Sequence, residues 1–266
     1  MIEYIPAEIL QTDLLERLVY PNLEQTLYWS DRWDPDFYVT LARAGFICIA
    51  TDHDELGPLL IPEMQDRYAV LDWPELHLSK NLRRIIRTGR LELEGISLRT
   101  SDPRNHVLPR IVEQYGSDCW VLDTYRALME PLLDDPIEGF ALHGIELWST
   151  NRDEPIAGEF GYSIGASYTS LSGFCSPADP QWRHFGTLQQ VLLARTLEAQ
   201  GYAFWNLGHP DMPYKHALGA RPLPRAEFLG RWFHARDERP EQPLENDEAL
   251  VWSLTDLDSC RAPWPG

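Results

Sequence analysis

The segment FWNLGHPDMPYKHALGA, residues 204–220, gathers side chains that can bind a ligand or transfer a proton. Asn206 has an amide that donates and accepts hydrogen bonds, and His209 has an imidazole, whose unperturbed pKa is ~6.5. Residues 203–207 have strand character, and a Gly-His-Pro break follows them. Polar groups at the end of a strand after a helical crossover often lie near a ligand. The segment therefore predicts a site, although a buried Asn that ties a loop together fits the same pattern.

Motifs of several other reaction classes are missing from the sequence. The chain has no GxSxG nucleophile motif, no HExxH metal motif and no phosphate-binding P-loop. Its cysteines lie far apart without a CxxC pair, so we expect neither a metal site nor a disulfide framework. This use of cysteine suits a reducing cytoplasm. The four cysteines are Cys48, Cys119, Cys175 and Cys260.

The length and charge of the chain limit its partners. Its 266 residues suffice for one large domain or two modest ones, and its formal net charge is −18. A surface of this sign repels nucleic-acid phosphates in general and favours cationic partners, or it serves solubility alone. No apolar run approaches the ~20 residues that span a bilayer, and the start lacks a signal-peptide pattern. We therefore expect a cytoplasmic monomer without a membrane contact.

Basic residues are concentrated in one segment, LSKNLRRIIRTGRL. Ser79 is a typical N-cap and Gly89 a typical helix stop, so the pattern predicts a helix over residues 79–89. Such a helix either contacts a polyanion or is a solvated face. Its apolar residues share one side, which leaves the basic side chains pointing outward: Lys80, Arg83, Arg84 and Arg87.

The elements that follow residue 103 are longer and more regular than those before it. Apolar spacing predicts two helices, three strands, a helix, a strand and a helix, in that order. This order is typical of a layered α+β or α/β domain. We expect a small N-terminal α/β domain at residues 1–100, a larger domain at 101–235 and an acidic, Pro-rich tail at 236–266.

Several segments keep their order along the chain: YAVLDWPELHLSKNLRR, HGIELW, PIAGEFGYSIGASYTSLSGF, GTLQQVLLARTLEAQGYAFWNLGH and YKHALGARPLPRAEFLGRW. Over roughly residues 64–232 they resemble the leucyl/phenylalanyl-tRNA–protein transferase family. The blocks WPELHLSKNLRR and LGARPLPRAEFL are the most specific. The resemblance implies an α+β fold in which a small N-terminal domain joins a C-terminal domain of the GNAT acyltransferase type, with a mixed β-sheet flanked by helices.

The resemblance also implies an activity. Enzymes of this family move a hydrophobic amino acid, such as Leu or Phe, from aminoacyl-tRNA to the N-terminal α-amine of a protein, which marks the protein for degradation. No separate cofactor is implied, because aminoacyl-tRNA is itself the donor. The acceptor usually begins with Arg or Lys, and an acidic protein attracts such a peptide.

Residues of this chain can be assigned to the two ends of such a donor. The basic residues that match the family's tRNA contacts are Lys80, Arg83, Arg84 and Arg87. The aminoacyl-adenosine end needs an apolar pocket, in which aromatic rings stack on the base and pack around the side chain. The same rings would also serve as core. The pocket is expected to draw on Trp120, Tyr162, Tyr168, Phe174 and Trp205.

The sequence departs from the family where polar catalytic groups are expected. The family's Asp-x-Gln falls on Asn206-Leu207-Gly208, and a family Glu falls on Ser172. Attack of an amine on an ester still needs orientation and a proton acceptor. Our hypothesis is that Asn206 and Ser172 orient the reactants by hydrogen bonds, while His209 or Glu159 accepts the proton.

Two other functions stay open. The segment RHFGTL, residues 183–188, half-matches the (Q/R)-x-x-G-x-(G/A) turn with which GNAT enzymes bind acyl-CoA at a helix N-terminus. Acyl-CoA would then be the donor in place of aminoacyl-tRNA. A scaffold that has lost its acid and base residues would instead be a non-catalytic module that binds a peptide N-terminus or an amino acid.

Overall fold

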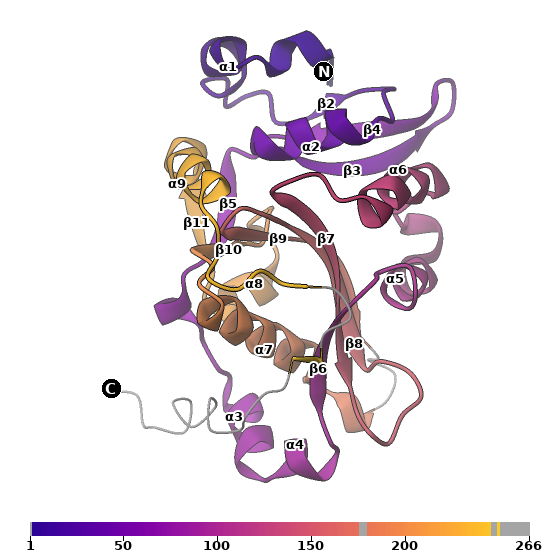
Figure 1. The fold of residues 1–266 in the computed structure, drawn as a ribbon, viewed down its shortest axis with the longest axis vertical. Helices are drawn as coiled ribbons and strands as arrows, with labels where there is room; N and C mark the ends of the chain where they lie inside the picture. Colours follow the sequence, from indigo (N-terminus) through magenta and orange to yellow (C-terminus); the bar gives the residue numbers. More distant parts are fainter. Residues whose placement is uncertain (1, 176–179, 246–248, 251–266) are drawn as a thin grey trace.

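The computed structural model describes residues 2–175, 180–245 and 249–250. Within these residues, an eight-stranded sheet has the order β11-β5-β10-β9-β8-β7-β6-β12, with helices on both faces (Figure 1). The sheet is mixed, and this arrangement confirms the α+β class expected from the sequence. Its strands are β5 (Arg67–Leu71), β6 (Ser97–Ser101), β7 (Phe140–Trp148), β8 (Ala157–Ile164), β9 (Ser167–Cys175), β10 (Phe204–Asn206), β11 (Arg221–Pro224) and β12 (Ala249–Leu250).

A smaller N-terminal layer lies at one end of the sheet (Figure 1). It is built on the antiparallel hairpin of β3 (Ile47–His53) and β4 (Gly57–Glu63), on which α2 (Pro35–Arg43) packs. The Asp34 side chain caps α2 by accepting a hydrogen bond from the Phe37 N–H at 2.8 Å. The short elements before α2 are β1 (Glu3–Tyr4), η1 (Ala7–Leu10), α1 (Thr12–Leu14), the π-helical turn η2 (Leu15–Val19) and β2 (Tyr28–Trp29).

The helices beyond the N-terminal layer cover both faces of the sheet. α7 packs on one face, and α5 and α6 pack on the other. No helix in the described ranges is both long enough and apolar enough to cross a membrane. The helices are α3 (Lys80–Arg87), α4 (Arg90–Leu93), α5 (Val107–Tyr115), α6 (Asp123–Asp134), α7 (Phe185–Ala199), α8 (Pro213–Leu218) and α9 (Arg225–Asp237), with 3-10 turns η3 (Trp73–Glu75), η4 (Gly116–Asp118) and η5 (Pro180–Trp182).

Two clusters of buried apolar side chains fill the two faces, because successive side chains of a strand alternate between them. On β7, Leu142 belongs to the cluster shared with α5 and α6, whereas Ile145 belongs to the cluster shared with α7. The first cluster also contains Tyr38 of α2 and Phe46, which precedes β3. The N-terminal layer and the large sheet therefore share one core.

The large sheet draws on both sides of the boundary expected at residue 100. Strand β5 lies before that boundary and β6 crosses it, yet both belong to the eight-stranded sheet. At the other end, residues 236 and 237 complete α9, so the helix extends past the expected start of the tail. Most of the tail, including Cys260, lies outside the described residues.

The predicted basic helix is confirmed as α3. The Ser79 hydroxyl accepts a hydrogen bond from the Leu82 N–H at 3.3 Å, and Gly89 follows the helix with a φ of 68°. Leu82, Ile85 and Ile86 are buried, as the spacing indicated. α3 is thus held to the protein by one apolar side, and its basic side chains lie on the other.

A single buried guanidinium, that of Arg225, joins α9 to the N-terminal layer. The side chain is fully buried and donates hydrogen bonds to backbone carbonyl oxygens from two segments. Its Nη1 reaches Asn22 O at 2.7 Å and Val19 O at 3.1 Å, and its Nη2 reaches Met64 O at 2.6 Å. Its Nε donates to Gln65 O at 2.8 Å. Burial without a carboxylate partner in contact lowers the Arg225 pKa, and the carbonyl oxygens supply the compensating contacts.

We expect Arg225→Ala to lower the free energy of unfolding by about 3 kcal/mol or more. The substitution leaves several buried carbonyl oxygens without a donor, and each such group costs about 1–3 kcal/mol. Urea unfolding of the variant and the parent protein measures the difference.

Arg239→Ala is the matched control, because Arg239 forms an ion pair with Glu138 in which both side chains are more than 80% exposed. Exposed pairs contribute about 0–1 kcal/mol. Equal stability losses in the two variants would contradict the role assigned to Arg225.

Candidate active site

The candidate site lies where two parallel strands part. β10 pairs with β9 only over Phe204–Asn206, opposite Ser167–Thr169. β9 continues to Cys175, and in the described residues no strand flanks that edge of β9 beyond Thr169. Gly173 O and the Cys175 N–H of this stretch bind Tyr115 Oη and Gln114 Oε1, and the stretch from Ser170 to Cys175 lines a cavity.

Asn206 ends β10 and so produces the opening. Its Oδ1 accepts a hydrogen bond from the Gly208 N–H at 3.0 Å, and its Nδ2 donates to Thr169 Oγ1 at 3.3 Å. Gly208 has a φ of 73°, a left-handed conformation that glycine adopts without strain. The chain turns there toward β5, where the Ala69 N–H donates to Gly208 O at 2.7 Å.

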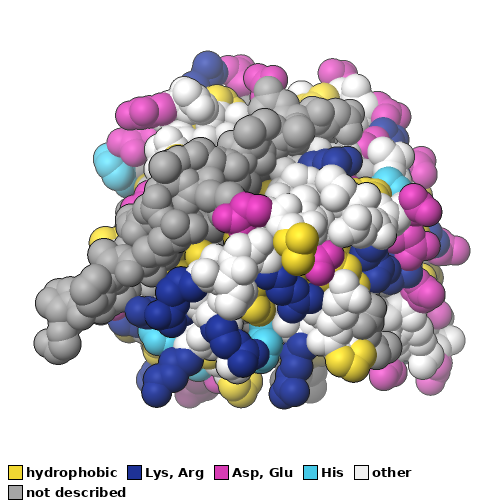
Figure 2. Space-filling view, turned by 90° about the horizontal axis from the view of Figure 1, so that it is seen from below, with side chains coloured by type: hydrophobic (Ala, Val, Ile, Leu, Met, Phe, Trp, Pro, Cys, Tyr) yellow, Lys and Arg dark blue, Asp and Glu magenta, His cyan; other side chains and the backbone are white. Residues whose placement is uncertain are grey.

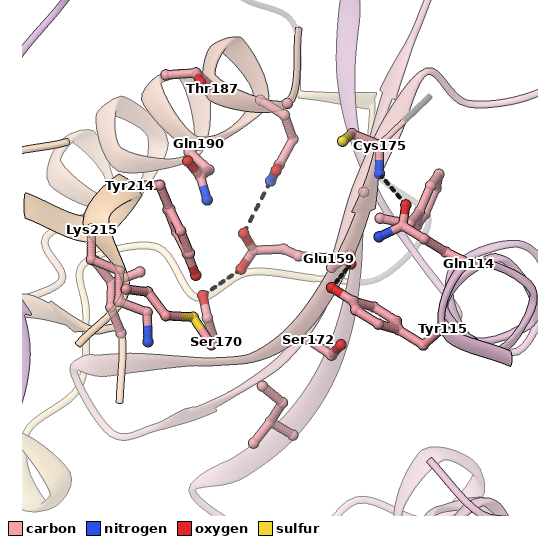
Figure 3. Close-up of a pocket in the computed structure, with 18 of the residues that line it drawn as sticks. Gln114, Tyr115, Glu159, Ser170, Ser172, Cys175, Thr187, Gln190, Tyr214 and Lys215 are labelled. Carbon is pink, nitrogen blue, oxygen red and sulfur yellow. Dashed lines mark hydrogen bonds between the residues drawn. The ribbon is translucent and has the colours of Figure 1, made fainter. Parts of the chain in front are cut away.

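A cavity of about 490 Å³ occupies the opening (Figure 3). This volume lies within the usual range for small-molecule sites. Its walls come from β8 and β9, the first turns of α7, Leu207 after β10, the start of α8, and the segment from the end of α5 to Trp120. The polar residues that line it include Gln114, Glu159, Ser170, Ser172, Thr187, Gln190 and Lys215.

Glu159 is a buried carboxyl on the cavity wall, only 4% exposed. It accepts hydrogen bonds from Ser170 Oγ at 2.7 Å, Tyr168 Oη at 3.1 Å and Gln189 Nε2 at 3.2 Å. Burial raises the Glu159 pKa, and these donors oppose the rise. In Figure 3 the carboxyl points into the cavity between β9 and α7.

Ser170 is oriented by a second donor. Trp205 Nε1 donates to Ser170 Oγ at 2.8 Å, and Ser170 in turn donates to Glu159. Trp205 itself is fully buried and is not part of the cavity wall. The indole therefore acts on the site through Ser170.

Lys215 lines the opposite side of the cavity and is missing from the residues expected from the sequence. Its side chain is 5% exposed, and its Nζ donates to His209 O at 2.7 Å. Burial lowers the Lys215 pKa to about 8, and the charge of Glu63 opposes that shift. One feature of the sequence could have pointed to Lys215, because lysine is rare in this chain. Only two of the 23 Lys and Arg residues are lysines, Lys80 and Lys215.

The cavity has an aromatic and apolar wall. Trp120 and Phe174 belong to it, as expected from the sequence, and Tyr115 and Tyr214 join them. The Tyr115 hydroxyl donates to Gly173 O at 3.2 Å, which fixes this ring against β9. Burial raises the Tyr214 pKa above its ordinary value, so this phenol stays protonated near neutral pH.

The structure brings together four of the nine expected pocket residues and sets the others apart. Glu159, Ser172, Trp120 and Phe174 line the cavity, whereas Tyr168 and Trp205 reach it through their hydrogen bonds to Glu159 and Ser170. The remaining three residues are not part of the cavity wall: Tyr162, Asn206 and His209.

Each of these three has a different position. Tyr162 is buried in the core, where its ring stacks on Phe140 with centroids 5.4 Å apart. Asn206 is buried with its amide engaged by Thr169 and Gly208. The His209 side chain is half exposed, and its Nδ1 accepts from the Asp211 N–H at 3.3 Å, so it caps the loop.

The expected tRNA-binding residues lie on the surface of α3. Lys80, Arg84 and Arg87 are exposed, and Arg83 is partly exposed with its Nε bound to Leu78 O at 3.0 Å. Among the described residues none of the four forms an ion pair with a carboxylate. Figure 2 shows Lys and Arg side chains gathered on the face that carries α3 and α4.

Arg90 of α4 connects this basic face to the cavity. Its guanidinium lies 4.9 Å from the ring centroid of Phe185 and donates to Gln181 O. Phe185 begins α7, and the next residues, Gly186 and Thr187, line the cavity. The basic face therefore continues to the first turn of α7, at the rim of the cavity.

Comparisons with known proteins agree with the sequence motifs. A family model described as an acetyltransferase (GNAT) domain matches residues 77–216. Curated relatives include the leucyl/phenylalanyl-tRNA–protein transferases of Hahella chejuensis, 27% identical over 62% of this chain, and Thiobacillus denitrificans, 28% identical over 62%. These matches cover 64% and 66% of the relatives' lengths, so less than two thirds of each. The resemblance to this family, as a divergent relative, is confirmed.

Solved structures were also matched at lower similarity. The structure of L-PGS from Bacillus licheniformis has a TM-score of 0.40 and 13% identity, covering 84% of this chain and 78% of that one. The C-terminal domain of a putative lysylphosphatidylglycerol synthetase from Agrobacterium fabrum has a TM-score of 0.36 and 15% identity, covering 84% and 65%.

We expect the stability gained by Glu159→Gln, relative to the parent protein, to increase as pH rises. A carboxyl whose pKa is higher in the folded state stabilises the fold fully below its unfolded pKa of ~4.3 and loses that contribution as pH rises through the folded pKa. The amide that replaces the carboxyl has no charge to desolvate, so the variant lacks this loss. Unfolding free energies measured from pH 4 upward test this, and a difference independent of pH would contradict the burial effect on Glu159.

Proposed function

Because this chain belongs to the acetyltransferase (GNAT) domain family, whose model matches residues 77–216, and resembles leucyl/phenylalanyl-tRNA–protein transferases, we propose that it transfers an aminoacyl group. The donor is aminoacyl-tRNA carrying a Leu- or Phe-like residue, and the acceptor is the N-terminal α-amine of a protein or peptide. The proposal is carried by one observation: the buried carboxyl of Glu159 faces a cavity that has an aromatic and apolar wall and lies beside a basic face.

Glu159 favours an aminoacyl donor over a simple acyl donor. An aminoacyl ester carries a free α-ammonium next to the reacting carbonyl, and an acetyl group carries no charge. A buried carboxylate gains most from a cationic partner, since an unpaired charge in a low-dielectric site is costly. We assign Glu159 to the donor's α-ammonium, with Ser170 and Gln189 holding the carboxyl in place.

The remaining walls suit the other parts of the donor. Phe174 and Trp120 provide apolar surface for a Leu or Phe side chain. Tyr115 and Tyr214 provide rings on which the terminal adenine can stack, an interaction of about 1–3 kcal/mol per base. The basic residues of α3 and Arg90 meet the phosphates of the acceptor stem, which the net charge of −18 would otherwise repel.

Acyl-CoA is the second candidate donor, and the N-terminus of α7 favours it. Gly186 and Thr187 in the first turn line the cavity, and His184 makes no side-chain cap there, so backbone N–H groups are available to a pyrophosphate. Leu188, which replaces the small residue of the GNAT turn, is buried in the core and does not obstruct this position.

Transfer is tested by incubating the full chain with separately labelled aminoacyl-tRNAs and peptides that differ in their first residue. We expect label at the peptide N-terminus with Leu- or Phe-tRNA, and at least tenfold less from N-acetyl-Phe-tRNA, which lacks the α-ammonium. Peptides beginning with Arg or Lys test the expected basic preference. No transfer by folded protein, together with micromolar CoA binding in calorimetry, would replace this proposal with the acyl-CoA one.

We expect the double substitution Arg84→Ala/Arg87→Ala to weaken tRNA binding without changing the rate at saturating tRNA. Loss of two phosphate contacts reduces the slope of log K against log salt concentration by up to about 2. Filter binding between 50 and 200 mM salt measures the slope. The control is Arg32→Ala, because Arg32 pairs with Asp34, the N-cap residue of α2, and α2 lies at the other end of the molecule from α3 in Figure 1. An equal effect of Arg32→Ala would contradict the assignment.

A further inference from the structure

The distribution of lysine in this chain singles out one position. Of 23 Lys and Arg residues, 21 are Arg, and the two lysines are Lys80 and Lys215. Arginine stays protonated in proteins, whereas lysine can lose its proton when it is buried. Lys80 lies exposed on α3 with the other basic residues, whereas Lys215 is buried on the wall of the cavity. The chain thus has a cation that can become a base at the site.

The contacts of Lys215 leave its nitrogen able to accept a proton. In the neutral form Nζ has two hydrogens and one lone pair. One hydrogen is donated to His209 O at 2.7 Å, and no other hydrogen bond of Nζ is formed with the described residues. The lone pair and the second hydrogen remain for a molecule in the cavity, which Lys215 lines.

Several titratable groups surround Lys215. Figure 3 shows Tyr214 between Lys215 and Glu159, with the phenol directed toward the centre of the cavity. The Lys215 pKa falls to about 8 because burial penalises the ammonium, while Glu63 on β4 favours it. A substantial neutral fraction therefore exists near pH 8. The groups facing it are Glu63 of β4, Glu159 of β8, His209 of the preceding loop, Tyr214 of α8 and, on the far wall, Tyr115 and Asp118.

We infer that Lys215 is the general base of the transfer reaction, accepting a proton from the acceptor's attacking α-amine. This inference rests on the proposed aminoacyl transfer and adds the residue that handles the proton. Asn206 and His209 do not line the cavity, and Glu159 is assigned to the donor. Lys215 therefore takes the role of proton acceptor in place of the family's Asp, whose position is Asn206 in this chain.

In this step Lys215 accepts one proton and later returns it. The neutral α-amine attacks the ester carbonyl, a C–N bond forms, and the amine passes one proton to Nζ. The ester C–O bond then breaks, and the Lys215 ammonium gives that proton to the departing ribose oxygen of the tRNA. The products are a peptide bond and deacylated tRNA, and Lys215 returns to its neutral form.

Lys215→Arg is the sharpest variant, because it keeps a cation and a donor for His209 O but cannot accept a proton. General bases contribute about 10²–10⁴-fold, so we expect single-turnover transfer at pH 8 to fall about a hundredfold or more. As pH increases toward 8, the ratio of the parent rate to the variant rate should rise about tenfold per pH unit, because the neutral fraction of Lys215 grows. Above pH 8 the ratio should stay constant. The acceptor amine titrates in both proteins, so the ratio removes its contribution.

A titration that needs no activity tests the same assignment. Reductive methylation with ¹³C labels the two lysines and the N-terminal amine, and Lys80→Arg assigns the signals by NMR. We expect Lys215 to titrate near pH 8 in the full, folded chain. A midpoint above pH 10, the ordinary lysine range, would overturn the inference without reference to the reaction.

The outcomes separate the two proposals. If the parent protein transfers amino acids and Lys215→Arg keeps its rate and pH profile, Lys215 is not the base while the proposed function stands. If Lys215→Arg retains the rate but Lys215→Gln does not, the cation stabilises the developing oxyanion, and the base assignment is wrong. If the parent protein transfers nothing from any aminoacyl-tRNA, the proposed function fails and the inference fails with it.

Discussion

The parting of β9 from β10 is the constraint on which the candidate site depends. If β10 continued beside β9, its backbone would occupy the edge along which the cavity opens. Asn206 prevents this by accepting the Gly208 N–H, and Gly208 turns the chain toward β5. An amide performs this role without adding a charge to a buried strand end. Asn206, which stands where the family has an acid, therefore shapes the cavity without lining it.

Charge is separated along the path of the proposed donor. In this proposal the phosphates meet the exposed arginines of α3 and the partly exposed Arg90 of α4, which stay protonated and tolerate water. The reacting end meets Glu159 and Lys215, two groups whose charged forms burial disfavours. The permanently charged arginines thus attract the polyanion at the surface. Glu159 and Lys215, which can gain or lose a proton, lie where the α-ammonium binds and the proton is transferred. The whole chain has a net charge of −18, so the basic face is the favourable approach for tRNA.

Local patterns predicted much of the fold. The Ser79 cap and the Gly89 stop delimit α3, and strand and helix order was recovered from β7 to α8 because hydrophobic periodicity is a local property. Side-chain direction was harder. Tyr162 follows Glu159 by an odd number of positions on β8, so it faces the opposite core. Lys215 was missed because its chemistry depends on its burial, on the charge of Glu63 and on the hydrogen bond to His209 O, and these are not visible in the sequence.

The buried hydrogen bonds of Arg225 also affect the order in which the protein can fold during synthesis. Its partners Val19 and Asn22 precede it by 206 and 203 residues, so these hydrogen bonds join residues that lie very far apart in the sequence. At ~5–20 residues per second, about 10–40 s pass between translation of these partners and of Arg225. Throughout that interval the carbonyls around residues 19–25 lack their donor. Within this chain, the N-terminal layer is therefore synthesised well before the residue that joins it to α9.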